Sequence, residues 1–293
     1  MKFTLDITAA CISLLATTTF ALPGPEIHRR AVSQELFQEF VRAAQLSHGA
    51  YQNRCASPVG TTRLYTIRNS QYDTDGFISR DDSRKEIVVA FRGTGGILDA
   101  IIDLRNTLVP YTSPGADGCT GCTVHQGFQQ QWNAVAAAVV SQLRTALGRN
   151  PDYTITITGH SLGGALTTMS APTIAKAFPG KVTAYSLASP RVGNPAFIAF
   201  VEALVPKEKL FRLTHTDDNV PQDLTPAEGY RHMATEYWMS TDPVTAENIV
   251  QCDGGEDPTC NVAHATANAG LTGINEAHFN YMNIDFSADE ADC

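Results

Sequence analysis

The chain has 293 residues, of which 43% are hydrophobic and 17% charged, and its formal net charge is −9. This composition supports a sizeable buried core and argues against a disordered chain. The acidic balance repels phosphate backbones and anionic membranes, so we expect no nucleic-acid partner. No stretch after residue 30 is long and apolar enough to span a bilayer, so no transmembrane segment is expected.

The N-terminal residues have the features of targeting and processing segments. A lysine precedes an apolar stretch, and Thr19-Phe20-Ala21 offers a small-x-small cleavage site, so we predict a signal peptide over residues 1–21. Residues 22–30 end in Arg29-Arg30, which indicates a propeptide removed at a dibasic site and a single folded domain over residues 31–293. A first buried helix and two ordinary surface arginines are the alternatives to these assignments.

The cysteine pattern agrees with secretion. Of seven cysteines, Cys11 lies in the predicted signal peptide and six remain, and an even number in a secreted chain favours three disulfides. The sequence alone allows fifteen pairings of six cysteines. Cys119-Thr-Gly-Cys122 has the spacing of a redox or zinc pair, but there is no second such pair and its flanks are typical of a loop. We therefore expect a local structural disulfide.

Periodic apolar residues predict alternating helices and strands. In chain order, we expect a helix over 33–47, strands over 63–68, 72–79 and 86–91, a long amphipathic helix over 128–147, and strands over 153–158, 182–187 and 210–214. Such alternation predicts an α/β fold, a mostly parallel central sheet with helices on both faces. Ligands in such folds bind at the carboxyl ends of the strands, and every motif below falls at such an end or in a loop.

A Gly-x-Ser-x-Gly motif, Gly159-His160-Ser161-Leu162-Gly163, follows a predicted strand and opens a predicted helix. This is the context of a nucleophile elbow, in which the serine takes a strained conformation and the glycines avoid a clash. We therefore predict an α/β-hydrolase fold with Ser161 as its nucleophile, against the alternative of an ordinary turn. Pro172 lies inside the following helix and predicts a kink or a break near Ala171.

Acyl chemistry at this serine needs hydrogen-bond donors for the negative oxygen that develops on the substrate. One donor is expected to be the backbone N–H of Leu162, the residue after the nucleophile. The other is expected in the turn Phe91-Arg92-Gly93-Thr94, which leaves a strand at its carboxyl end, because Thr94 offers both a backbone N–H and a hydroxyl. A plain glycine-rich turn is the alternative for this segment.

The triad order in this fold is Ser, then Asp or Glu, then His. The last predicted strand runs into a loop that contains Asp217 and Asp218, which are equally placed by chemistry alone. The histidine that follows them must be His232, His264 or His278, and we favour His278 because it follows a glycine-rich loop that can return the imidazole to the serine. Four other histidines are expected to be structural residues with local hydrogen bonds: His125, His160, His215 and His232.

Further stretches belong to one recognisable set. They are Phe91-Arg-Gly-Thr94, Cys119-x-x-Cys122, His125-Gln-Gly-Phe128, Gly159-His-Ser-Leu-Gly-Gly164, Pro190-Arg-Val-Gly-Asn194, Thr214-His-Thr-Asp-Asp-Asn-Val-Pro221, Gly229-Tyr-Arg-His232 and Glu236-Tyr-Trp238. With this set, the chain resembles the filamentous-fungal lipases of class 3 and their relatives, the type A feruloyl esterases. The resemblance covers nearly all of residues 31–293 and implies a lipase catalytic domain there.

The resemblance also implies roles for individual residues. Its T-H-x-x-D-x-V-P motif selects Asp218 over Asp217, its late H-x-x-Y element selects His278, and the family's oxyanion residue falls on Thr94. The cysteine positions are similar to the family pairings Cys55–Cys293, Cys119–Cys122 and Cys252–Cys260.

The segment after Thr94 bears on the substrate class. Apolar residues alternate with polar ones there in the pattern of a short amphipathic helix with a broad apolar face: Ile97, Leu98, Ile101, Ile102, Leu104 and Leu108. In lipases of the family this position is the lid, a helix over the active site that turns its apolar face outward on an oil surface. A permanently buried helix beside the pocket is the alternative, and the feruloyl esterases carry a polar segment here.

The leading hypothesis is a secreted, extracellular and monomeric triacylglycerol lipase that acts on ester or lipid substrates at the lipid–water interface. The alternatives are a feruloyl or other carboxylesterase that acts on soluble or cell-wall esters, and a lipid-binding pseudo-hydrolase, which would require a lost triad residue. The sequence contains no metal-binding cluster and no nucleotide-binding loop, so neither a metal nor a cofactor is expected.

Overall fold

The computed structural model describes residues 31–52, 55–93, 107–265 and 273–287. The predicted signal peptide and propeptide lie outside these ranges, so both stay predictions. Among the described residues, no helix combines the length and apolarity that a membrane crossing requires.

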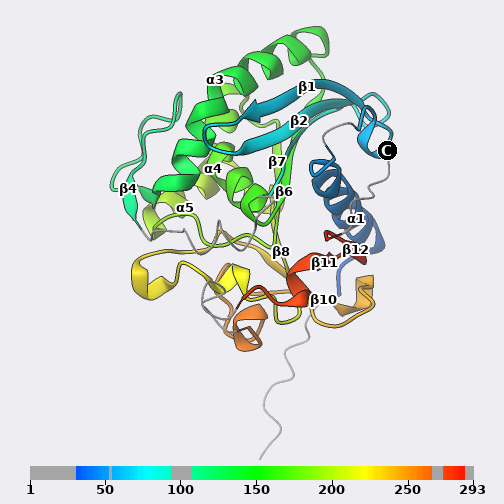
Figure 1. The fold of residues 1–293 in the computed structure, drawn as a ribbon, viewed down its shortest axis with the longest axis vertical. Helices are drawn as coiled ribbons and strands as arrows, with labels where there is room; N and C mark the ends of the chain where they lie inside the picture. Colours follow the sequence, from blue (N-terminus) through cyan, green and yellow to red (C-terminus); the bar gives the residue numbers. More distant parts are fainter. Residues whose placement is uncertain (1–30, 53–54, 94–106, 266–272, 288–293) are drawn as a thin grey trace, which may run out of the picture.

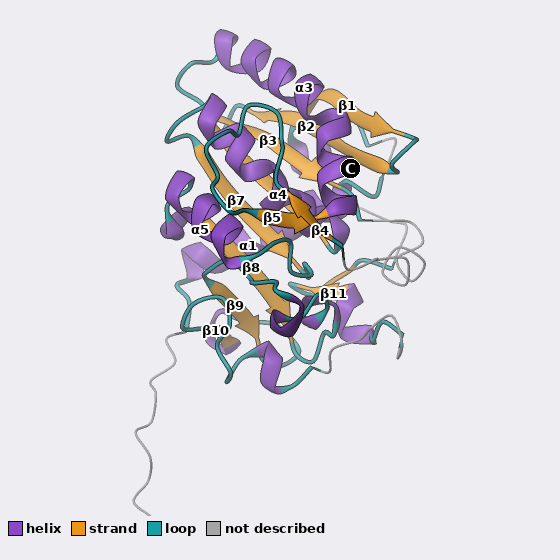
Figure 2. Cartoon of the chain, turned by 90° about the vertical axis from the view of Figure 1, so that its left-hand side faces the viewer, coloured by secondary structure: helices purple, strands orange, loops and turns teal. Residues whose placement is uncertain are grey.

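An eight-stranded sheet forms the centre of the molecule, in the order β1-β2-β3-β6-β7-β8-β9-β10. From β3 to β9 neighbouring strands run parallel, and β1, β2 and β10 are antiparallel to their neighbours at the two edges. Figure 2 shows these strands following one another from β1 at the top to β10 at the bottom. The strands are β1 (Thr62–Asn69), β2 (Thr74–Asp81), β3 (Glu86–Phe91), β6 (Thr154–His160), β7 (Val182–Leu187), β8 (Leu210–His215), β9 (Glu236–Met239) and β10 (Ile249–Gln251).

Within the described residues, two separate strand pairs and four α-helices accompany this sheet. The pairs are β4 (Leu108–Pro110) with β5 (Thr123–His125), and β11 (Asn280–Tyr281) with β12 (Ile284–Asp285). The helices are α1 (Gln34–Gly49), α3 (Gln126–Arg149), α4 (Leu162–Ala177) and α5 (Pro195–Leu204). Helix α1 lies on one side of the sheet, and α3, α4 and α5 lie on the other (Figure 1).

Strand β3 illustrates why both faces of the sheet are covered, since every one of its residues is buried. Ile87 and Val89 belong to the apolar cluster that includes α3 and α4. Val88 and Ala90 belong instead to a cluster with Leu46 of α1. Because successive side chains of a strand point to opposite faces, this continuous apolar run supplies both layers of the core. The prediction of a strand over residues 86–91 is confirmed.

Helix α4 begins against the carboxyl edge of the sheet at very short range. A Cβ on Gly163 would lie 2.3 Å from the carbonyl oxygen of Phe91, and one on Gly164 would lie 2.6 Å from the carbonyl oxygen of Leu187. These carbonyls end β3 and β7, so only residues without side chains fit at this point. The close approach brings the start of α4, and the residue before it, to the edge where three parallel strands end.

The structure corrects one expectation and adds elements that the sequence pattern did not reveal. Pro172 does not break its helix, because α4 continues to Ala177. The helix is buried from Leu162 to Ala175, so its packing against the sheet and α3 holds the backbone where the proline removes one hydrogen bond. Strands β9 and β10 and helix α5 were not predicted, because the strands are short and the helix is apolar without a clear period.

Two glycines in helices should respond to the same substitution with opposite signs. We expect Gly164→Ala to destabilise the fold by about 1–3 kcal/mol, because its Cβ has no space against Leu187. We expect Gly148→Ala in α3 to stabilise it by roughly 0.5–1 kcal/mol, since nothing lies within 4 Å of a Cβ there. Urea unfolding midpoints of the two variants measure both changes. A stabilised Gly164→Ala variant would contradict the close packing of α4.

Candidate active site

Ser161 occupies the sharp turn between β6 and α4. Its backbone has φ 59° and ψ −124°, a conformation that costs free energy for a residue with a side chain. The turn is held by a hydrogen bond from the Ser161 N–H to the carbonyl oxygen of Leu187 at 2.9 Å. A Cβ on Gly159 would lie 2.3 Å from the backbone of Gly163, so glycine is required at this crossing. The predicted elbow is therefore present.

Three side chains from distant parts of the sequence meet at this turn. The His278 ring lies with Nε2 3.0 Å from the hydroxyl oxygen of Ser161, and its Nδ1 lies 3.0 Å from both carboxylate oxygens of Asp218. All three side chains are buried. Asp218 follows β8, and His278 lies in the short 3-10 helix η7 (Glu276–Phe279). A hydroxyl, an imidazole and a carboxylate thus stand in hydrogen-bonded series, which is the arrangement that a nucleophile, a base and an orienting acid require.

The geometry distinguishes the two aspartates that chemistry alone left equivalent. Asp217 is exposed, whereas Asp218 is fully buried and faces the imidazole. Asp218 also accepts hydrogen bonds from the N–H of Val220 at 3.0 Å and from the hydroxyl of Tyr281 at 2.5 Å. Burial and the adjacent carboxylate raise the pKa of Tyr281 well above its usual value, so it remains a donor. In the sequence, Tyr281 is only the last residue of the H-x-x-Y element, and no local pattern there indicates its contact with Asp218.

A second histidine supports the backbone of the first. His160 Nε2 lies 2.8 Å from the carbonyl oxygen of His278, and its Nδ1 lies 2.9 Å from the hydroxyl of Tyr51. Because a carbonyl only accepts, Nε2 carries the proton and Tyr51 donates to Nδ1. Burial lowers the pKa of His160 well below its usual value, which agrees with this neutral form. His160 is thus a structural histidine, and it holds the segment that carries His278.

His215, at the end of β8, holds the backbone of Ala277, the residue before His278. Its Nδ1 lies 2.9 Å from the carbonyl oxygen of Ala277, and its Nε2 lies 3.0 Å from a carboxylate oxygen of Asp242. His125 accepts a hydrogen bond from the N–H of Phe128, and His232 donates to the carbonyl oxygen of Pro221, so these two histidines bond locally, as expected. The expectation of local bonds is wrong for His160 and His215, which bond to the segment that carries His278.

The two expected oxyanion donors differ in how far the structure describes them. Leu162 is the first residue of α4, so its N–H has no preceding helical carbonyl to bond and lies directly after the nucleophile. Thr94 lies outside the described residues, so its role stays a prediction. The positive end of the α4 dipole adds a favourable field for negative charge at this position.

The segment proposed as a lid also lies largely outside the described residues, namely Ile97, Leu98, Ile101, Ile102 and Leu104. Leu108 is described, and here the expectation of a helix over 97–108 is wrong. Leu108 begins strand β4 and pairs with His125 of β5. Leu108 is therefore not part of the expected helix, because it pairs with a neighbouring strand.

The structure contains two of the three disulfides that the resemblance implied, Cys119–Cys122 and Cys252–Cys260. Cys55 is buried, but Cys293 lies outside the described residues, so their pairing stays a prediction. Cys252, Asp257 and Cys260 bring three potential metal ligands together. The sulfur atoms of Cys252 and Cys260 are bonded to each other, so neither cysteine is a thiolate that could bind a metal.

Comparisons with known proteins show the family of this chain. The family described as lipase (class 3) matches residues 88–227. The secreted mono- and diacylglycerol lipase A of Penicillium cyclopium is 31% identical over 266 residues, which cover 83% of this chain and 84% of that protein. The chain belongs to the class 3 lipase family. A second family member, the secreted mono- and diacylglycerol lipase 1 of Fusarium solani, is 36% identical over 214 residues, 70% of this chain but only 59% of that protein.

Solved structures of this family share the fold. A triacylglycerol lipase from Penicillium expansum superposes with a TM-score of 0.80 at 25% identity, over 89% of this chain and 99% of that one. Another triacylglycerol lipase, described as having a serine protease triad as its catalytic centre, superposes with a TM-score of 0.76 at 26% identity over 89% of this chain and 99% of that one. This class 3 family member therefore has the predicted α/β-hydrolase fold.

The hydrogen bond from Tyr281 to Asp218 should matter for turnover. We expect Tyr281→Phe to lower kcat roughly tenfold, since a hydrogen bond to a charged group contributes about 1.5–3 kcal/mol and 1.4 kcal/mol corresponds to a factor of ten in rate. Steady-state kinetics on a soluble short-chain ester measures this change. Tyr230→Phe is the matched control, because the buried hydroxyl of Tyr230 has no hydrogen-bond partner in the part of the chain that is described. Equal kcat values for the two variants would contradict the role of Tyr281.

The depressed pKa of His160 predicts loss of stability in acid. The unfolded chain takes up a proton near pH 6.5, whereas buried His160 takes it up only at lower pH. Its contribution is therefore complete above about pH 6.5 and is lost as the pH falls below that value, by up to about 1.4 kcal/mol per pH unit. His160→Gln should flatten the fall in unfolding free energy over this window. His232→Gln should do the same, since burial and two arginines lower its pKa. Unchanged slopes in both variants would refute the assignment.

Proposed function

We propose that the protein is a secreted serine esterase that hydrolyses carboxylic esters, and that its substrates are acylglycerols. The observation that carries this proposal is the buried series Ser161–His278–Asp218 at the carboxyl edge of the sheet, with hydrogen bonds of 3.0 Å at each step. Membership of the class 3 lipase family supports the ester chemistry. The names of the Penicillium and Fusarium relatives support acylglycerols as the substrate class.

The proposed reaction begins with acylation of the serine. His278 Nε2 accepts the Ser161 proton while the hydroxyl oxygen attacks the ester carbonyl carbon. The resulting tetrahedral oxyanion is stabilised by the N–H of Leu162 and by Thr94. The intermediate collapses when the imidazolium returns its proton to the alcohol oxygen, which leaves with an intact O–H bond. The acyl group remains as an ester of Ser161.

Hydrolysis of this acyl-enzyme repeats the same transfers with water. His278 takes a proton from the attacking water, a second tetrahedral oxyanion forms, and the proton passes to the Ser161 oxygen as the fatty acid leaves. Asp218 keeps the imidazole in the tautomer with its proton on Nδ1 and stabilises the imidazolium in both steps. No proton is consumed by the enzyme over the cycle.

The proposal extends to where the enzyme works. We infer an extracellular monomer that acts at the lipid–water interface, with residues 97–108 as the apolar segment next to the site. The even number of cysteines after the predicted signal peptide and the secreted relatives support export. The acidic net charge of −9 disfavours adsorption to anionic bilayers, so a neutral oil phase is the preferred surface.

A substrate panel tests the proposal. We expect hydrolysis of emulsified triolein, and for tributyrin a rise in rate when its concentration passes the solubility limit. Ser161→Ala should lower the rate by at least about 10⁴-fold and abolish labelling by a fluorophosphonate. Cleavage of methyl ferulate without any cleavage of triolein would overturn the lipase assignment in favour of a feruloyl esterase. Labelling that persists in Ser161→Ala would overturn the nucleophile.

A further inference from the structure

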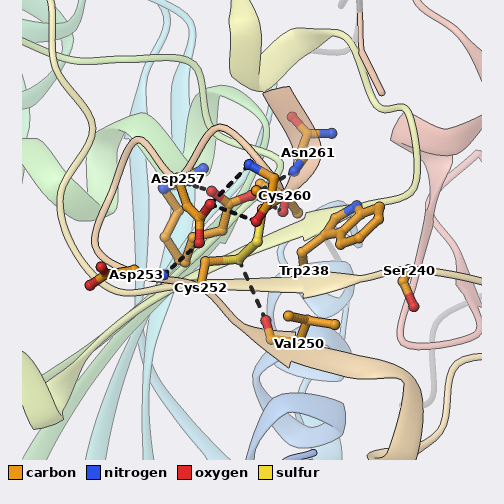
Figure 3. The surroundings of a disulfide bond; sticks show 12 residues. Trp238, Ser240, Val250, Cys252, Asp253, Asp257, Cys260 and Asn261 are labelled. Carbon is orange, nitrogen blue, oxygen red and sulfur yellow. Dashed lines mark hydrogen bonds and ion pairs between the residues drawn. A yellow bond between two sulfur atoms is a disulfide. The ribbon is translucent and has the colours of Figure 1, made fainter. Parts of the chain in front are cut away.

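The loop closed by the Cys252–Cys260 disulfide lies next to the loop that carries Asp218. Cys252 and Cys260 are bonded to each other and pack with Trp238 in a small buried cluster (Figure 3). Inside the loop, Asp257 accepts hydrogen bonds from the backbone N–H groups of Asp253 and Thr259, so its carboxylate serves the turn itself. The next residue after the disulfide, Asn261, is fully buried.

Every hydrogen-bonding group of Asn261 that faces the site has a partner. Its side-chain amide donates to the carbonyl oxygens of Thr216 at 3.2 Å and of Asp218 at 3.0 Å. Its side-chain oxygen accepts from the amide of Gln222 at 2.7 Å, and its backbone N–H donates to Glu236 at 3.3 Å. The two carbonyls belong to residues 216–218, which we call the acid loop. Because the two N–H bonds of a primary amide lie in one plane at a fixed angle, this single group fixes the spacing of these two carbonyls.

The acid loop needs such support because its backbone is strained. Thr216 has φ 32°, a left-handed conformation that is costly for a β-branched residue. Its carbonyl oxygen accepts a second hydrogen bond from the indole N–H of Trp238 at 2.9 Å, and its N–H donates to the carbonyl of Met239 at 2.8 Å. Both donors to this carbonyl, Trp238 and Asn261, come from the neighbourhood of the disulfide (Figure 3).

We propose that Asn261 is a positioning residue for the triad, which clamps the backbone of residues 216–218 so that the Asp218 carboxylate faces His278, and that the Cys252–Cys260 ring holds Asn261 in place. The inference rests on the proposed function, since it assigns Asn261 a role in the same reaction. Within the described part of the chain, Asn261 forms no hydrogen bond to a triad side chain; it acts through main-chain oxygens.

Kinetics of Asn261→Ala tests the clamp. Because a small misplacement of a catalytic group costs up to about 100-fold in rate, we expect kcat on a soluble short-chain ester to fall about 10- to 100-fold. KM should stay within about twofold, since the acid loop does not contribute ester-binding groups in this mechanism. The matched control is Asn194→Ala at the start of α5, away from the triad; its amide also bridges backbone groups, since it donates to the carbonyl oxygen of Gly121 and accepts from the N–H groups of Thr123 and Phe197. Its kcat should equal that of the wild type.

A spectroscopic readout separates this inference from the proposed function. The proton shared by His278 Nδ1 and Asp218 gives a low-field ¹H resonance, which reports the geometry of that pair without any substrate. We expect it in the wild type and in Asn194→Ala, and expect it to shift or disappear in Asn261→Ala. A wild type that shows the resonance but cleaves no ester would sink the proposed function and leave the clamp standing. An unchanged resonance and kcat in Asn261→Ala would sink the clamp alone.

Two further variants cover a folding defect and the role of the disulfide. Asn261→Ser keeps one short donor and should retain a cooperative thermal transition with an intermediate kcat. If Asn261→Ala and Asn261→Ser both lose that transition, Asn261 is a folding residue and the proposal is wrong. The pair Cys252→Ser with Cys260→Ser should lower kcat, and adding Asn261→Ala should lower it by less than the product of the separate factors. Independent, multiplicative losses would show that the disulfide does not act through Asn261.

Discussion

A carboxylate without access to water is the constraint on which the site depends. The Asp218 side chain is completely buried, and a buried charge is tolerated only where hydrogen-bond donors replace its hydration. Those donors are the N–H of Val220, which follows Asp218 closely, and the His278 ring and the Tyr281 hydroxyl, which both come from the segment near the end of the described chain. Removal of any one donor is costly in free energy, because the buried Asp218 carboxylate cannot replace the lost hydrogen bond with one to water. The tertiary structure around β8 is therefore organised to keep this one side chain satisfied.

The imidazole is held in a similar way, but through its main chain. The carbonyl oxygens of Ala277 and His278 bond to the rings of His215 and His160, each at the end of a parallel strand. Rigid strand ends thus hold a segment that is itself too short to be stable alone, the single turn η7. The main chain that carries the His278 imidazole is therefore held rigidly, which favours repeated proton transfer over the same short distance.

Much of this could be predicted from the sequence because the signals were local. The strand–serine–helix context specified the elbow at Ser161; a continuous apolar run specified β3, and short stretches rich in apolar and β-branched residues specified β6, β7 and β8. The acid could not be chosen from residues alone, since Asp217 and Asp218 differ only in which way a strained loop turns them. The roles of Tyr281, His160 and Asn261 depend on contacts between segments far apart in sequence, and no periodicity encodes such contacts. Pro172 misled for the converse reason: packing of α4 overrode a local preference.

The order of the reacting groups along the chain has a consequence for biosynthesis. Ser161 is made first, Asp218 next and His278 last, and the imidazole needs both earlier residues to be in place. A ribosome-bound chain that stops short of His278 lacks the base of the proposed reaction, so it cannot cleave an ester by that mechanism. The cell that makes this protein is thus exposed to its chemistry only after His278 has been translated.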